Sequence, residues 1–370
     1  MKKRTFNIQN ILRDNIKTIQ SYSSARDEFT DAASGMVFLD ANENPFESGV
    51  NRYPDPQQKS VKQQLSLLKE VPIDQIFLGN GSDEVLDLIM RAFCEPNKDN
   101  VIILPPTYGM YKVLANINAI DVKEVVLTTN FEPKTQTILL AANEDSKVLF
   151  LCSPNNPTGN TFSSIQVEKL LNQFRGIVVV DEAYIDFSEK DSWLKRLSEF
   201  PNLVITQTLS KAYGVAGIRL GTCYASKEIV KVLNSIKPPY NVNELTQQKA
   251  SERLSKPAKI AAEIEEINTQ KKGLKKQLSQ INFIETVYDS DANFLLIKVD
   301  DANKRYAQLI EKAIVVRNRS NEPLCDNCLR ISVGTGKENE KLIEVLSNLG
   351  VQDSNKGISI KNKQPLRTRN

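Results

Sequence analysis

The sequence predicts an α/β fold with a large domain and a smaller one. Four short apolar runs rich in β-branched residues alternate with stretches of helical periodicity, as in the βαβ units of a parallel sheet. These runs lie at 101–104, 148–151, 177–180 and 203–206. We therefore expect a large domain over 52–240. Strand and helix patterns alternate again over 284–350, which predicts a smaller domain within 241–350.

Composition is that of an ordinary globular protein, with 40% hydrophobic and 25% charged residues. The formal net charge of +3 does not indicate nucleic acid as a partner. No segment approaches the roughly eighteen consecutive apolar residues of a membrane-spanning helix. The amino end lacks the apolar core and cleavage site of a secretory signal. We therefore expect a cytoplasmic protein with neither nucleic acid nor membrane as a partner.

Residues 1–51 are expected to form an arm and part of the small domain. One helical stretch near the amino end is followed by the segment SYSSAR, at 21–26. Arms of this kind often cross to a partner subunit.

The segment GNGSDE, at 79–84, precedes a run whose apolar residues recur at helical spacing. Small residues at a helix start leave backbone N–H groups free to hold a phosphate at the positive end of the helix dipole. Gly81, Ser82 and Asp83 are therefore candidates for a phosphate site. Ser82 as an N-cap followed by acidic residues is equally the ordinary start of a helix.

Two of the four apolar runs, 148–151 and 177–180, are followed by polar residues. CSPNNPTG, at 152–159, predicts a tight turn that presents the Asn156 amide. VVVDEAY, at 178–184, places Asp181 at the carboxyl end of a buried strand, where open α/β folds bind ligands. A carboxylate at that position could hold a cationic ring nitrogen. Taken alone, the first motif is equally an ordinary loop and the second a polar strand end.

TLSKAYGVAGIRLG, at 208–221, combines Ser210, Lys211 and Arg219. Lys211 could form an imine with an aldehyde, while Ser210 and Arg219 converge on a phosphate. The alternative for this lysine alone is a surface position on a loop.

Together, these four motifs resemble the aspartate aminotransferase superfamily of pyridoxal phosphate enzymes, also called fold type I. The resemblance covers about 20–350 and implies a mostly parallel seven-stranded sheet between helices in the large domain. It implies that Lys211 forms the imine with the cofactor and transfers the proton, that Asp181 binds the pyridine nitrogen and that Tyr108 stacks on the ring. By the same resemblance, the other cofactor residues are Gly81, Ser82, Asp83, Asn156, Tyr184, Thr208, Ser210, Arg219 and, from a neighbouring subunit, Tyr53.

Segments outside the cofactor motifs are most similar to the histidinol-phosphate aminotransferases, of the class II aminotransferase family. They are SYSSARDEF near the amino end, LDANENP (39–45), RYPDP (52–56), PTYGMY (106–111), PPYNVNE (238–244), VVRNR (315–319) and CLRISVGT (328–335). This similarity implies a homodimer that transaminates L-histidinol phosphate with 2-oxoglutarate in histidine biosynthesis. It implies that Arg330 binds a substrate carboxylate and Arg317 the substrate phosphate, with Tyr22 and Asn44 also at the substrate.

The sequence leaves other functions open. An aromatic amino acid aminotransferase or a phosphothreonine decarboxylase would share every cofactor motif, and a non-catalytic regulator could keep the fold. The chain contains no histidine, which argues against a Ser-His hydrolase and a histidine-bearing zinc site. Five scattered cysteines indicate reduced thiols. Although Cys325 and Cys328 form a CxxC, we expect a structural role for them and no metal site.

Three expectations concern the carboxyl-terminal third. The polar run from 244 to about 280 predicts one long helix with a solvated face. NFLLIKV, AIVVR and LRISV are expected to be strands, and KENEKLIEVLSNL the last helix. The basic tail, 351–370, is expected to be disordered or lightly docked, with no assigned function.

Overall fold

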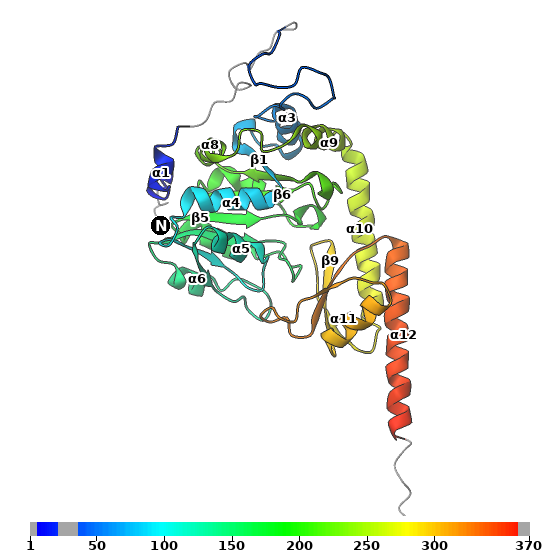
Figure 1. Ribbon diagram of the computed structural model, residues 1–370. Helices are drawn as coiled ribbons and strands as arrows, with labels where there is room; N and C mark the ends of the chain where they lie inside the picture. Colours follow the sequence, from blue (N-terminus) through cyan, green and yellow to red (C-terminus); the bar gives the residue numbers. More distant parts are fainter. Residues whose placement is uncertain (1–5, 21–35, 362–370) are drawn as a thin grey trace, which may run out of the picture.

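The computed structural model describes residues 6–20 and 36–361, with the backbone alone for 352–361. A large α/β domain and a smaller one are connected by a long helix, α10 (Figure 1). The strands of the large domain are β1 (Ile76–Asn80), β2 (Asn100–Ile103), β3 (Asp121–Glu124), β4 (Ser146–Cys152), β5 (Ile177–Asp181), β6 (Leu203–Thr208) and β7 (Leu220–Tyr224). Its helices are α3 (Lys59–Lys69), α4 (Ser82–Phe93), α5 (Met110–Ile117), α6 (Thr135–Ala141), α7 (Ser164–Gln173) and α8 (Lys227–Ile236), preceded by α1 (Asp14–Lys17).

The large sheet has seven strands in the order β1-β7-β6-β5-β4-β2-β3. The strands from β6 to β3 pair in parallel, whereas β7 is antiparallel to both of its neighbours. The predicted α/β class and the mostly parallel seven-stranded sheet are confirmed.

Both faces of this sheet are buried. In β5, Val178 and Val180 pack into one core, while Ile177 and Val179 pack into the core on the other face. This period of two explains why the strand is uniformly apolar, since each face is covered by helices. The polar Asp181 follows at the end of β5, on the same face as Ile177 and Val179, because side chains alternate along a strand.

The expected single helix over 244–280 is wrong. The structure has two helices there, α9 (Glu244–Leu254) and α10 (Pro257–Leu278). Pro257 cannot donate a backbone hydrogen bond and disfavours the helical conformation at the preceding residue. Lys256 accordingly has φ −119° and ψ 53°. α10 runs from this break along the large domain to the small one (Figure 1).

The small domain contains an antiparallel sheet in the order β10-β11-β9-β8. Its strands are β8 (Ile284–Val287), β9 (Phe294–Val299), β10 (Arg317–Asn318) and β11 (Cys328–Ser332), with α11 (Ala302–Glu311) and α12 (Gly336–Lys361) as further helices. The expected strand AIVVR is therefore reduced to Arg317–Asn318. Its first residues instead close α11, where the Ala313 and Ile314 amides donate to Ile310 and Leu309.

Three further expectations concern the carboxyl-terminal tail, membrane-spanning helices and the cysteines. α12 continues to Lys361, beyond Val351, where we expected the disordered tail to begin; residues 362–370 lie outside the described part. Across the described residues, no helix combines the length and apolar character needed to cross a membrane. All five cysteines are buried and unpaired with one another.

Candidate active site

A pocket lies where β4, β5 and β6 end and α4 begins. Because these strands are parallel, their carboxyl ends meet at one edge of the sheet, the usual ligand position in open α/β folds. The lining residues are Ser82, Asp83, Tyr108, Cys152, Asn156, Asp181, Ala183, Tyr184, Thr208, Ser210, Lys211 and Arg219. The pocket thus gathers most of the predicted cofactor residues. Gly81 adjoins Ser82, and Tyr53 lies elsewhere.

Lys211 lies in the loop that joins β6 to β7. The Ser210 amide donates to Thr208 Oγ1 at 3.1 Å, and the Leu209 amide donates to the Leu220 carbonyl at 3.0 Å, so both ends of the loop are fixed. The Lys211 amine is 5.7 Å from the centre of the Tyr184 ring. Desolvation by the pocket walls, followed by the positive charges of Arg330 and Arg219, lowers the pKa of Lys211. A lower pKa increases the fraction of neutral amine, which is the nucleophilic form.

Asp181 is almost completely buried at the end of β5. Its Oδ2 accepts a hydrogen bond of 2.6 Å from the Tyr111 hydroxyl, and its Oδ1 accepts one of 3.3 Å from the Ala183 amide. Burial raises the pKa of Asp181, and the Tyr111 hydrogen bond opposes this effect. Of the described lysines and arginines, none forms an ion pair with this carboxylate. The site therefore presents a buried acceptor suited to a cationic or N–H group.

Tyr111 did not appear among the predicted site residues. A weak signal was present, because Tyr111 follows the predicted site residue Tyr108 by three positions in PTYGMY, although Tyr108 precedes the first residue of α5. Its partner Asp181 is 70 residues away in the chain, however. Only the packing of α5 on the sheet brings the two together.

Asn156 connects the pocket to the small domain. Its Oδ1 accepts a hydrogen bond from Nη1 of Arg330, which belongs to β11. The Arg330 guanidinium also lies 5.3 Å from the ring centre of Phe294. Burial, together with the nearby Arg319 and Arg317 charges, lowers the pKa of Arg330. Like charges thus gather where β10 and β11 face the large domain, which favours an anionic ligand there.

The start of α4 and Arg219 form the other end of the pocket. The Gly81 amide donates to the Arg219 carbonyl at 2.9 Å, and Arg219 Nη2 lies 3.7 Å from Asp83 Oδ2. Asp83 Oδ1 also accepts a 3.0 Å hydrogen bond from the Tyr108 hydroxyl. Gly81 has φ +80°, and a Cβ built on it would lie 2.7 Å from Arg219 Nη2. Glycine therefore lets the backbone approach the guanidinium, as in cradles for phosphate.

The predicted substrate residues are not all brought to the pocket. Arg317 pairs with Arg330 in the β10–β11 register, so their side chains share a face, but Arg317 is exposed. Arg319 lies on that face two residues later and is more buried, but it was not among the predicted site residues. The Asn44 side chain accepts a local hydrogen bond from the Phe46 amide at 2.9 Å and lines neither described pocket. Tyr22 lies outside the described residues.

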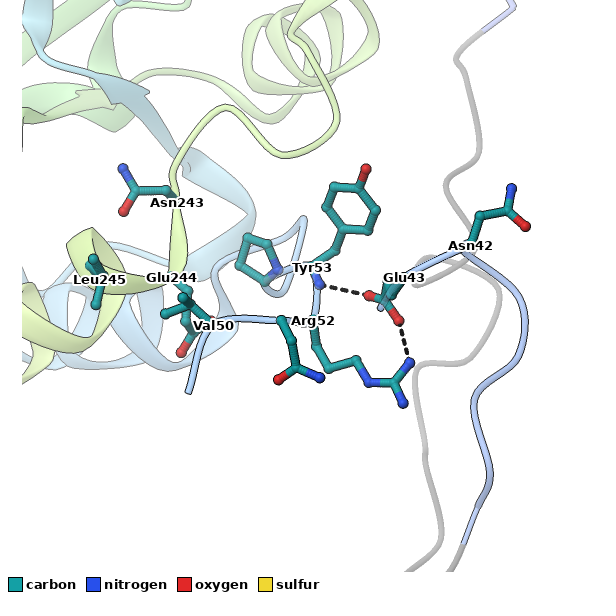
Figure 2. A pocket seen from close by; sticks show the side chains of 10 residues that line it. Asn42, Glu43, Val50, Arg52, Tyr53, Asn243, Glu244 and Leu245 are labelled. Atoms are coloured by element: carbon teal, nitrogen blue, oxygen red, sulfur yellow. Dashed lines mark hydrogen bonds and ion pairs between the residues drawn. The ribbon is translucent and has the colours of Figure 1, made fainter. Parts of the chain in front are cut away.

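Tyr53 lies in a separate hollow of about 380 Å³ (Figure 2). Its ring stacks on Tyr240 with centres 4.4 Å apart, and half of its surface is exposed. Its amide donates to Glu43 at 2.7 Å, while Arg52 donates to the same carboxylate at 2.8 Å. Within one chain, Tyr53 therefore does not join the other cofactor residues. The described residues also gather no cluster of acidic and cysteine side chains suited to a metal ion.

Comparisons with known proteins agree with this geometry. The family model for aminotransferase class I and II matches residues 37–346. The histidinol-phosphate aminotransferase of Flavobacterium johnsoniae is 64% identical over 346 residues, which cover 93% of this chain and 99% of that protein. Further relatives with the same name are 49–60% identical.

Solved structures show the same fold. The histidinol-phosphate aminotransferase of Clostridium acetobutylicum has a TM-score of 0.76 at 23% identity and covers 82% of this chain and 92% of that one. The Sinorhizobium meliloti enzyme of that name, solved with pyridoxal-5'-phosphate, has a TM-score of 0.75 at 21% identity, with coverages of 81% and 83%.

Proposed function

This chain belongs to the class I and class II aminotransferases, and from that premise we propose that it transfers the amino group of L-histidinol phosphate to 2-oxoglutarate. The products are imidazole-acetol phosphate and glutamate, in a step of histidine biosynthesis. The observation that carries the proposal is 64% identity along 99% of a relative named histidinol-phosphate aminotransferase. A likeness of that extent includes the substrate segments as well as the cofactor motifs.

Pyridoxal phosphate is the cofactor of this family, and it supplies an aldehyde and an electron-withdrawing pyridine ring. The pocket offers a complementary group for each of its parts. The Lys211 amine, whose pKa is lowered, suits the aldehyde. Buried Asp181, which has no cationic partner among the described residues, suits the ring nitrogen. The backbone at Gly81, the amides at the start of α4 and the Arg219 side chain suit the phosphate. The residues present therefore fit the cofactor.

Lys211 has two tasks in the proposed reaction. Its neutral amine would hold the cofactor at the aldehyde carbon. As a free amine, it would take the proton from the carbon that bears the substrate's amino group and carry it to the cofactor carbon that bore the aldehyde. A lowered pKa suits both tasks, since each needs the unprotonated amine near neutral pH. The chain contains no histidine, which is the commonest general base, and the Lys211 amine is suited to that role.

The remaining pocket residues orient the bound molecules. We infer that Asn156 and Tyr184 bind the ring hydroxyl, that Tyr108 stacks on the ring, and that Ser210 and Thr208 assist at the phosphate end. Their convergence on one pocket supports these roles. Asn156 already holds Arg330 through its side-chain oxygen.

Arginines suit the two anionic substrates, because the planar guanidinium matches carboxylate and phosphate through paired hydrogen bonds. We assign the carboxylate of glutamate and 2-oxoglutarate to Arg330, which reaches the pocket from the small domain. We assign the phosphate of the donor to Arg317, with Tyr22 and Asn44 as further contacts. The shared face of Arg317 and Arg330 on β10 and β11 supports this assignment.

We also propose that the chain acts as a cytoplasmic homodimer in which Tyr53 of one subunit reaches the cofactor phosphate of the other. The place of Tyr53, exposed and apart from the pocket of its own chain, supports this arrangement (Figure 2). Sedimentation of the purified protein tests it, since a monomer with full activity would contradict the shared site.

The decisive experiment supplies L-histidinol phosphate to the purified holoprotein without a keto acid. The absorbance of the bound cofactor should change once, and turnover should begin only after 2-oxoglutarate is added, with glutamate formed in equal amount. Carbon dioxide release from phosphothreonine without a keto acid would replace the proposal with decarboxylation. A strong preference for phenylalanine over L-histidinol phosphate would indicate an aromatic amino acid aminotransferase. A protein that binds the cofactor and turns over none of these compounds would indicate a regulator.

A further inference from the structure

A tyrosine behind the pocket contacts one of its central residues. Tyr111, in α5, is completely buried. Its ring stacks on Phe150 of β4, with centres 4.8 Å apart, and meets the Tyr108 ring edge-on at 5.5 Å. Its hydroxyl donates a 2.6 Å hydrogen bond to Asp181 Oδ2. Packing against two rings thus fixes where this donor stands.

The buried Asp181 carboxylate depends on such donors. An ionised carboxylate that leaves water is costly unless hydrogen bonds replace its solvation. The Ala183 amide is 3.3 Å away, whereas the Tyr111 bond is short, as expected when a hydroxyl donates to a charged oxygen. Each oxygen of Asp181 accepts one of these bonds and keeps a further lone pair for a ligand.

We propose that Tyr111 is a positioning residue for Asp181: its hydroxyl holds the carboxylate ionised and in the orientation that receives the ring nitrogen of the cofactor. The inference rests on the proposed function, because it takes Asp181 as the partner of that nitrogen. Without the hydroxyl, the buried carboxylate becomes more basic. Asp181 then keeps the proton that it otherwise leaves on the nitrogen, and electron withdrawal by the ring weakens.

The test is Tyr111→Phe, which keeps the stacking ring and removes the hydroxyl alone. Holoprotein is prepared with pyridoxal phosphate labelled with ¹⁵N at the ring, and the nitrogen resonance of the resting protein is recorded at neutral pH. We expect it to move toward the position of an unprotonated pyridine. We also expect kcat to fall about tenfold while the KM of the donor stays unchanged, as for a lost hydrogen bond to a charged group.

Tyr224→Phe is the matched control. It removes a buried tyrosine hydroxyl from β7 of the same sheet, and this hydroxyl has no hydrogen-bond partner in the described structure. Both the nitrogen resonance and kcat should stay at wild-type values. An unchanged resonance in Tyr111→Phe would overturn the inference, and so would an equal change in both variants.

A second variant strengthens the hydroxyl as a donor instead of removing it, and its result does not depend on whether Tyr111→Phe folds. Difluorotyrosine at position 111 keeps the ring and hydroxyl and makes the hydroxyl a stronger donor. The nitrogen should then remain protonated, with kcat at or above the wild-type value; movement toward the unprotonated position would contradict the inference. Because the resonance is read without substrate, it tests Tyr111 even if the wild-type protein rejects histidinol phosphate, a result that would count against the proposed function alone.

Discussion

The two sides of the pocket are built differently. On the proposed cofactor side, Asn156, Asp181 and Lys211 lie at or just beyond the ends of neighbouring strands of one sheet, and hydrogen bonds within the large domain fix Asp181 and the Lys211 loop. On the substrate side, Arg330 reaches across from the small domain, while Arg317 is exposed. The first side takes its described residues from one domain, and in the proposed dimer Tyr53 of the other subunit completes it. The second depends on how two domains approach each other.

This difference teaches where specificity resides. A side chain fixed by a buried sheet cannot move far to suit different substrates, because close-packed interiors resist displacement. In the proposed reaction it would therefore serve the step that all substrates share, and side chains on the small domain would distinguish the two substrates. Substitutions on the cofactor side should affect every substrate alike, and those on the substrate side should separate donor from acceptor.

The largest effect is expected for Lys211→Ala. Loss of the amine removes both nucleophile and general base, so turnover should fall by about 10⁴-fold or more for every donor. Glutamate formation and the absorbance of the bound cofactor measure this. Lys272→Ala, at an exposed lysine of α10, should behave as wild type. Retention of the wild-type cofactor absorbance in Lys211→Ala would remove this residue from the cofactor side.

Arg330→Gln should lower kcat/KM for 2-oxoglutarate about 100-fold, because paired hydrogen bonds to a carboxylate are lost. Steady-state kinetics with the acceptor varied at saturating donor measures the loss. An equal loss for the phosphate donor would show that Arg330 does not discriminate between the substrates.

Arg317→Gln should act in the other direction. It should lower kcat/KM for L-histidinol phosphate about tenfold, a smaller loss than for Arg330→Gln because an exposed arginine contributes less than a buried one. An unphosphorylated aromatic donor and 2-oxoglutarate should be nearly unaffected. The measurement is the ratio of kcat/KM values for phosphorylated and unphosphorylated donors. If the ratio does not change, Arg317 is not at the phosphate.

The smallest effect concerns pH and links the two sides. Arg330 and Arg219 both lower the pKa of Lys211, after desolvation. Removing the Arg330 charge raises this pKa, so less neutral amine is present at pH 7. In Arg330→Gln, the cofactor-free protein should capture pyridoxal phosphate several-fold more slowly at neutral pH, and the profile of rate against pH should move to higher pH. Arg317→Gln should leave the profile in place, and a shift in both variants would exclude this electrostatic link.

Much of the cofactor side was predictable because its signals are local. The apolar runs at 148–151, 177–180 and 203–206, which precede Asn156, Asp181 and Lys211, predict parallel strands, and parallel strands bring their carboxyl ends together. Contacts between distant segments were not predictable in this way. The Tyr111 bond to Asp181 and the Arg330 bond to Asn156 join residues 70 and 174 positions apart.

Two errors in the carboxyl-terminal third have physical explanations. The break before Pro257 could have been anticipated, since proline restricts the residue that precedes it. The missing strand over AIVVR was harder to foresee. Its apolar residues suit a strand, but Ala313 adopts φ +55° and its amide completes the end of α11.

The antiparallel strand β7 has one more consequence. The parallel strands are followed by helices or other crossovers, but β6 returns directly as β7, with Thr208 opposite Gly221. The loop between them carries Lys211 near one end and Arg219 at the other, and its ends are held by the Leu209 amide and by the bond from Gly81 to Arg219. A single loop therefore sets the distance between an amine and a guanidinium. That distance limits the length of a molecule that can contact both groups.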